Sequence, residues 1–249
     1  MERSVVLGGV PTRVLDEGRG PAVVLVHATP FDLDYWSGIA ADLSADHRVV
    51  RYDLPGHGAA SAAPVPTTDR LVGDLIDLLD LLDVPDAHLV GHSLGATVVQ
   101  RCALEHPTRV RRLSLLGARA TPSPLFETLA DALRRDVAAA DLSINRWFTP
   151  THLARNGDAV RYARTRIEAT PVAVWADGLD LLASTDVLAD LPRLTVPADV
   201  LVGEDDHGAK PEHGQEIAAA IPGARFHLIP RARSLVALEN PEIVAPLLR

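Results

Sequence analysis

Short apolar runs of the β-strand type alternate with longer helical patterns along most of this chain, and this alternation limits the folds it can adopt. The runs are continuous and rich in β-branched residues, as expected of strands buried on both faces, and they cover 22–27, 47–53, 87–92, 112–117, 198–203 and 224–230. Between them lies a helical pattern with one apolar face made of Val72, Leu75, Ile76, Leu79 and Leu82. Strand, helix and strand in this order predict an α/β fold with a mostly parallel central sheet and helices on both faces. Residues 3–7 and 12–18 are expected to form an N-terminal hairpin.

The stretch from about 121 to 191 interrupts the alternation. Its helical patterns are broken at TPSP, FTPTH, RNGD and ATP, which indicates several helices inserted between two strands. A helical lid over one end of the sheet fits this pattern, and so do further helices that simply cover the sheet. A length of 249 residues suits one core. We therefore predict a single domain over 1–249, with a core of 1–120 and 192–249 and a lid of about 121–191.

Composition and charge exclude several classes of protein. The formal net charge is −9, and the sequence has no block of like charges. Both features argue against nucleic acid or an anionic membrane as the main partner. A single cysteine, Cys102, excludes an internal disulfide and fits a reducing compartment. The first residues do not resemble a signal peptide, and no apolar run approaches the roughly 20 residues that span a bilayer. We expect a cytoplasmic protein with a small-molecule substrate. The sequence shows neither the residue spacing of a metal site nor a dinucleotide-binding motif, so we predict no metal and no organic cofactor.

The segment HLVGHSLGATVV, residues 88–99, contains a Gly-x-Ser-x-Gly motif between an expected strand and an expected helix. Gly91 and Gly95 would let the strand and helix approach closely, and Ser93 would stand in the sharp turn between them. Ligands of open parallel sheets bind outside the carboxyl ends of the strands, where this turn lies. The motif therefore makes Ser93 a candidate nucleophile.

Together with the segments 26–36 (VHATPFDLDYW) and 52–61 (YDLPGHGAAS), this motif resembles the α/β-hydrolases, close to lid-bearing esterases and 3-oxoadipate enol-lactonases. The resemblance runs from about residue 4 to 248. It implies an oxyanion hole made by the backbone amides of Thr29 and Leu94. Ala28 replaces the glycine usual in the family, which would alter the hole if that glycine needs a backbone angle that alanine disfavours. His27 is expected to support this loop, and His57 to be solvated or bonded to its own loop.

The resemblance also places the acid of a catalytic triad. The family has it three residues after the glycine that ends the strand at 198–203, which gives Asp206 in GEDDHG. Asp205 is the alternative and Glu204 a less favoured one. Any one of these carboxylates also fits a solvated acidic loop.

The triad histidine is the main departure from the family pattern. In the chain order serine, acid, histidine, an alignment on LVALENP puts Ser234 at the histidine position. A serine nucleophile needs a base, and a second hydroxyl cannot act as one near neutral pH. Other histidines are poor substitutes. His207 adjoins the acid on its loop, and His227 is expected to be a packed or edge residue of a strand. His213 is expected to face solvent on a helix, and His92 to point away from the cleft.

Further residues are candidates for the substrate pocket. Arg119 follows a strand end and would bind a substrate carboxylate or enolate, or else form a surface ion pair. Large aromatic side chains are candidates for apolar pocket walls or for the core: Phe31, Trp36, Trp147, Phe148 and Trp175.

The sequence thus predicts an enzyme that acts on a small ester, lactone or related carbonyl compound with an incomplete triad. Either its base is atypical or the chain carries a His-to-Ser change at 234. The alternatives are a lyase or cyclase of small-molecule biosynthesis on the same scaffold, and a ligand-binding protein without catalysis.

Overall fold

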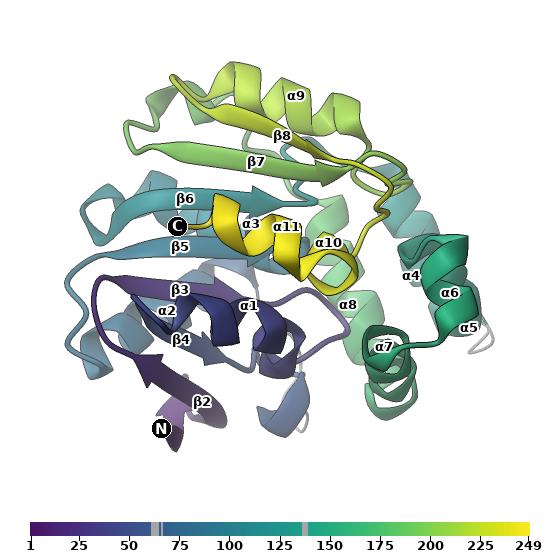
Figure 1. Ribbon diagram of the computed structural model, residues 1–249, viewed down its shortest axis with the longest axis horizontal. Coiled ribbons are helices and arrows are strands. Elements are labelled where there is room, and N and C mark those ends of the chain that lie inside the picture. Colours follow the sequence, from purple (N-terminus) through teal and green to yellow (C-terminus); the bar gives the residue numbers. More distant parts are fainter. Residues whose placement is uncertain (61–64, 66, 136–138) are drawn as a thin grey trace.

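The computed structural model describes residues 1–60, 65, 67–135 and 139–249, and within these ranges eight strands form one sheet (Figure 1). The strands are β1 (Glu2–Leu7), β2 (Val10–Gly18), β3 (Ala22–Val26), β4 (Arg48–Tyr52), β5 (Ala87–His92), β6 (Val110–Leu116), β7 (Ala198–Gly203) and β8 (Arg225–Ile229). Their order is β1-β2-β4-β3-β5-β6-β7-β8. The hairpin β1–β2 and the pair β2–β4 are antiparallel, and the remaining pairs are parallel. The predicted hairpin and mostly parallel sheet are therefore confirmed.

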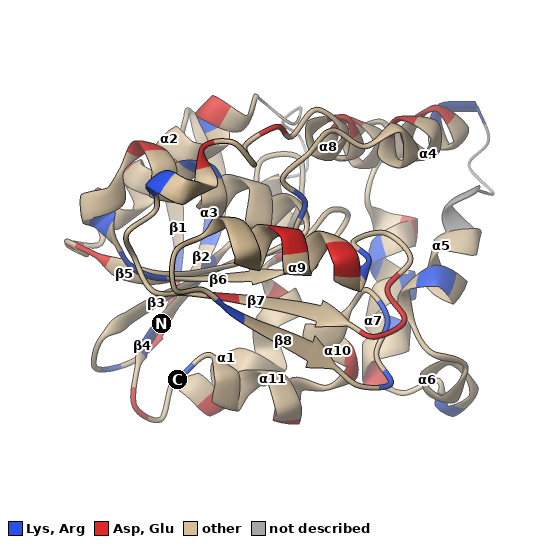
Figure 2. Ribbon diagram, turned by 90° about the horizontal axis from the view of Figure 1, so that it is seen from above, with Lys and Arg blue, Asp and Glu red and all other residues tan. Residues whose placement is uncertain are grey.

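Helices cover both faces of the sheet, as Figures 1 and 2 show. One face carries α1 (Ser37–Leu43), the short α10 (Val236–Glu239) and α11 (Pro241–Leu247), and the other carries α2 (Thr68–Leu81), α3 (Leu94–Glu105) and α9 (Pro211–Ala220). Short 3₁₀ turns occupy Leu33–Trp36, Gly58–Ala60, Pro107–Arg109 and Leu191–Arg193. None of the helices in the described ranges is long and apolar enough to cross a membrane.

Five further helices separate β6 from β7 within the described part of the chain. They are α4 (Pro124–Arg135), α5 (Ala139–Trp147), α6 (Pro150–Arg155), α7 (Asp158–Ala169) and α8 (Val172–Ala183). Helices α4 to α7 lie at the end of the sheet toward which the parallel strands point (Figure 1). Their span agrees with the insertion expected over about 121–191, while their action as a lid stays a prediction. Residues 136–138 of this stretch, and Ser61 of the segment 52–61, lie outside the described residues.

The core follows from the apolar runs of the sequence. Every residue of β5 and β7 is buried, and four of the five residues of β3 are, because helices pack on both sides of these central strands. On α2, Val72, Leu75 and Leu79 face the core as the helical pattern predicted.

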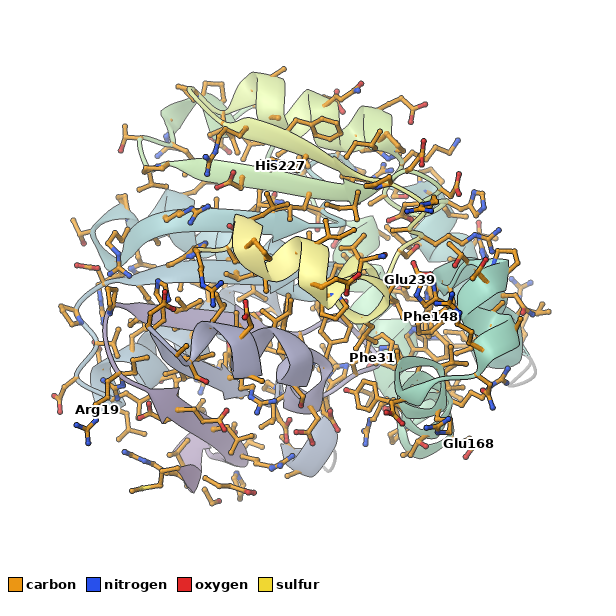
Figure 3. All side chains as sticks on the ribbon, viewed as in Figure 1. Arg19, Phe31, Phe148, Glu168, His227 and Glu239 are labelled. Atoms are coloured by element: carbon orange, nitrogen blue, oxygen red, sulfur yellow. The ribbon has the colours of Figure 1, made fainter. Side chains whose placement is uncertain are left out.

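A buried carboxylate joins three strands at the opposite end of the sheet from the inserted helices. Asp199, near the start of β7, accepts hydrogen bonds from Arg112 of β6 and from Arg225 and His227 of β8, at 2.7 to 3.1 Å. His227 is thus an edge-strand histidine, as expected (Figure 3). Burial alone would raise the pKa of Asp199, but the bonds from Arg225, His227 and Arg112 lower it to about 2.

We predict that Asp199→Asn lowers the free energy of unfolding by about 2 to 3 kcal/mol at pH 7, because it leaves Arg112 and Arg225 without their carboxylate. A carboxylate with a lowered folded-state pKa stabilises the fold above its unfolded-state pKa, near 3.9, and loses this effect as the pH falls toward 2. Urea unfolding should therefore show a difference between wild type and variant that shrinks below pH 4. The exposed Asp131→Asn is the control, and an equal effect of both variants would contradict the prediction.

Candidate active site

Ser93 stands in a sharp turn between β5 and α3. Its φ of 53° and ψ of −113° are unusual for a residue with a side chain and mark a strained backbone. The turn is held by two hydrogen bonds: the Ser93 N–H donates to the Leu116 carbonyl of β6 at 3.0 Å, and the Ser93 carbonyl accepts from the Thr97 N–H at 3.1 Å. The strand–turn–helix context that the motif predicted is therefore present.

The two glycines of the motif permit a very close approach of backbones. A Cβ atom on Gly91 would lie 2.3 Å from the Gly95 carbonyl oxygen, and one on Gly95 would lie 2.1 Å from the Val26 carbonyl oxygen. Both distances are far below van der Waals contact. Residues 91 and 95 must therefore be glycine if α3 is to begin directly behind β5 and β3.

Two buried histidines hold the loop that follows β3. The Leu54 N–H donates to His27 Nε2 at 2.9 Å, while His27 Nδ1 lies 2.9 Å from the Ala28 carbonyl. His57 Nε2 lies 3.0 Å from Thr29 Oγ1. Burial lowers the pKa of both rings, that of His57 to about 3, so both are neutral at pH 7. His27 supports the loop as expected, and the alternative of a solvated His57 is wrong.

The backbone amides of Thr29 and Leu94 have no hydrogen-bond acceptor among the described residues. Leu94 is the first residue of α3, where helical N–H groups lack intrahelical partners and the helix dipole favours negative charge. Ala28 does not adopt a positive φ, so alanine causes no backbone strain at this position. Of these two residues, Thr29 lines the cavity described below, and Leu94 is fully buried.

Asp206 lies three residues after the end of β7 and is 4% exposed. Its Oδ1 accepts hydrogen bonds from the Ser234 hydroxyl at 2.6 Å and from the N–H groups of Gly208 and Ala209 at 2.8 and 3.2 Å. Burial raises the pKa of Asp206, and these bonds oppose the rise. Glu204 and Asp205 are exposed, so Asp206 is the carboxylate of this loop that is buried beside Ser234.

Ser93, Asp206 and Ser234 line the same cavity, which contains about 870 Å³ of empty space, including space open to solvent. Its walls are mainly apolar. Phe31, Trp147 and Trp175 contribute from the predicted set, and α4 adds Leu125, Phe126, Leu129 and Leu133. These α4 residues were not predicted. Leu125, Leu129 and Leu133 are four residues apart and Phe126 is three residues before Leu129, so they share one face of a helix.

Three of the predicted pocket residues do not line the cavity. Trp36 is fully buried and packs edge-to-face on Tyr35 with ring centroids 5.0 Å apart, and Phe148 is also fully buried, so both belong to the core. The Arg119 guanidinium lies against the His213 ring at 2.8 Å. Arg119 forms no ion pair within the described ranges, and its expected contact with a substrate stays a prediction. His213 is half-buried instead of solvent-facing.

His92 corrects another expectation, because it lines the cavity and does not point away from it. Its ring stacks on Tyr35 with centroids 5.3 Å apart and an interplanar angle of 17°. Burial lowers the pKa of His92 to about 4, and the backbone of Ser234 partly opposes this effect. The neutral ring is thus a weak base next to the candidate nucleophile. Its burial was predictable from the strand, but the direction of its side chain was not.

Two further histidines that were considered as substitutes lie in different surroundings. His207 lines the cavity but is exposed, and His227 is bonded to Asp199 at the other end of the sheet. In the described part of the chain, no three His, Cys, Asp or Glu side chains are grouped so that they could hold a metal ion.

The inserted helices are attached to two loops of the site. The carboxylate of Glu239, in α10, accepts from the Thr149 N–H at the start of α6 and from the Arg233 N–H next to Ser234, at 2.7 and 2.6 Å. Figure 3 shows Glu239 and Phe148 where α10 meets these helices. Tyr162 of α7 donates to Asp32, in the loop after β3, at 2.7 Å. Charge-assisted bonds to the buried carboxylates Glu239 and Asp32 therefore join the helices to both loops.

Comparisons with known proteins agree with this geometry. Residues 21–241 match the family model described as alpha/beta hydrolase fold. The chain is 28% identical over 245 residues to a pimeloyl-[acyl-carrier protein] methyl ester esterase of Nitrosomonas europaea, covering 90% of this chain and 93% of that protein. It is 30% identical over 253 residues to the polyketide synthase ThaQ of Burkholderia thailandensis, covering 96% of this chain but only 12% of that protein. The enol-lactonase structure from Burkholderia xenovorans LB400 superposes with a TM-score of 0.89 at 27% identity, over 99% and 98% of the two chains.

We predict that Glu239→Gln lowers the free energy of unfolding by about 2 kcal/mol, because an amide NH₂ would face one of the two buried N–H donors. Amide hydrogen exchange at Thr149 and Arg233 should accelerate in the variant. Glu168→Gln is the matched control, since Glu168 is exposed on α7 (Figure 3) and should change stability by less than about 0.5 kcal/mol. Unchanged exchange at Thr149 and Arg233 would refute this role of Glu239.

Proposed function

The chain belongs to the α/β-hydrolase family, and we propose that it acts on a small ester, lactone or related carbonyl compound through Ser93, with an incomplete triad. The observation that carries this proposal is the lining of one cavity by Ser93, Asp206 and Ser234. The relatives support the substrate class, because they include a methyl ester esterase and 3-oxoadipate enol-lactonase 2 of Acinetobacter baylyi.

In the proposed reaction, the Ser93 hydroxyl attacks the substrate carbonyl and the resulting oxyanion accepts hydrogen bonds from the amides of Thr29 and Leu94. Both amides are unpaired in the described residues, as preorganised donors would be. The apolar walls from Phe31, Trp147 and Trp175 would hold the substrate and exclude water. The inserted helices act as a lid in this proposal, because α4 and α5 residues complete the walls.

The proposed site has no histidine at position 234 to remove the proton of Ser93. The Ser234 hydroxyl donates a hydrogen bond to Asp206. It cannot take up the proton of Ser93 as an imidazole would. Loss of one triad member still leaves roughly 10³- to 10⁴-fold catalysis over water from the oxyanion hole and binding. We therefore expect slow hydrolysis by the unmodified protein.

The missing imidazole also favours a second candidate, a non-hydrolytic lyase or cyclase on the same scaffold. Such an enzyme would use the free amides of Thr29 and Leu94 to stabilise an enolate and would not need Ser93 as a nucleophile. A ligand-binding protein without catalysis would retain the cavity but have no use for the unpaired amides or the strained turn at Ser93.

We predict that Ser234→His raises the rate of hydrolysis of a small activated ester by roughly 100-fold or more, which is the usual contribution of a positioned general base. Labelling of Ser93 by a fluorophosphonate probe should accelerate by a similar factor. The double variant Ser93→Ala/Ser234→His serves as the control and should neither turn over nor label. Rates come from the released chromophore, and the labelled residue from peptide mass spectrometry.

Two results would contradict this proposal. Brisk labelling of Ser93 in the unmodified protein would mean that the base is not missing. If Ser234→His remains as slow as the unmodified protein, hydrolysis through Ser93 fails and the lyase, cyclase or binding alternatives take its place.

A further inference from the structure

The carboxylate of Asp206 is satisfied on one oxygen only. Oδ1 accepts three hydrogen bonds, whereas no group among the described residues donates to Oδ2. Asp206 is nevertheless 4% exposed and lines the cavity. Oδ2 does not belong to the fully buried polar atoms of the described residues that lack a partner, so it keeps accessible surface from which it can accept a hydrogen bond. The cavity thus presents an acceptor for a ligand.

No cation within the described ranges neutralises this carboxylate. Neither arginine, lysine nor histidine forms an ion pair with Asp206, although ion pairs exist for many other acids of the chain. Arg146 of α5 lines the same cavity without pairing with it, His207 is exposed, and the buried His92 is neutral at pH 7. The hydrogen bonds to Oδ1, with a smaller contribution from the nearby His207, are what oppose the effect of burial on Asp206.

The cavity that Asp206 lines suits a flat organic cation. Ser234 is half-buried, and its short side chain occupies less space than the imidazole that the family has at this position. The aromatic rings of Phe31, Trp147 and Trp175 line the cavity, and aromatic faces attract weakly hydrated cations. A compact ammonium ion would lose more hydration here than a planar imidazolium.

We propose that the cavity beside Ser234 binds an imidazole-type nitrogen base against Oδ2 of Asp206, supplied by the substrate or by a second small molecule. This inference rests on the proposed function, because the bound base would stand in for the missing histidine. Its nitrogen removes the proton from Ser93 as the hydroxyl oxygen attacks the carbonyl carbon. Asp206 stabilises the protonated base, which then gives that proton to the leaving group as the acyl–serine forms. Water, deprotonated by the same nitrogen, hydrolyses the acyl–serine, and the proton returns to Ser93.

The test uses imidazole as the probe and the unmodified chain of 249 residues as the protein. Binding of imidazole at pH 7.5 is measured by isothermal titration calorimetry, and turnover of the activated ester is measured at increasing imidazole concentration. We expect saturable binding and a saturable increase in rate of at least tenfold over the imidazole reaction without protein. Ser93→Ala should keep the binding and lose the rate increase.

Three variants locate the site. Asp206→Asn should raise the dissociation constant for imidazole at least tenfold, while Asp205→Asn, which changes the exposed neighbour, should leave it unchanged. Ser234→His should abolish imidazole binding, because the ring of the new histidine fills the space. This variant tests the site independently if Asp206→Asn does not fold. No binding to the unmodified protein, or equal binding to Ser234→His, would overturn the inference. If Ser234→His gains activity in those cases, the proposed function stands. If imidazole binds but Ser234→His gains nothing, the binding site stands, and both the proposed function and the catalytic role of the bound base fail.

Discussion

The close contact between the start of α3 and the end of β3 is the constraint on which the site depends. Because residue 95 has no side chain, α3 begins directly against the Val26 carbonyl, and Ser93 is forced into its strained turn. The same contact brings the first amide of α3 near the loop after β3, which His27 and His57 hold in place. A side chain at residue 95 would push the start of α3 away from the end of β3 and so displace both the turn at Ser93 and the first amide of α3.

Much of this arrangement could be predicted from the sequence, because it depends on local patterns. The buried strands, the amphipathic α2, the turn at Ser93 and the acidic loop after β7 each follow from a short run of residues. The family resemblance then distinguished Asp206 from its two acidic neighbours, and the structure buries that residue while leaving the others exposed.

What the sequence could not provide was the direction of side chains set by tertiary packing. Trp36 and Phe148 are large and aromatic like Trp147, yet they pack into the core, and nothing in their neighbours distinguishes them. His92 directly precedes Ser93, and both line the cavity although side chains of neighbouring strand residues point to opposite faces of a sheet. The contribution of α4 depends on how the inserted helices pack, which no local pattern determines.

The charge cluster at Asp199 lies at the other end of the sheet from Ser93, and this separation has a consequence for how the protein can change. Its ion pairs join β6, β7 and β8 without using any residue of the cavity. An exchange at Ser234 itself would therefore leave this charge cluster intact, since none of its ion pairs involves that residue. The start of β7 and the cavity at its other end can therefore change independently of each other.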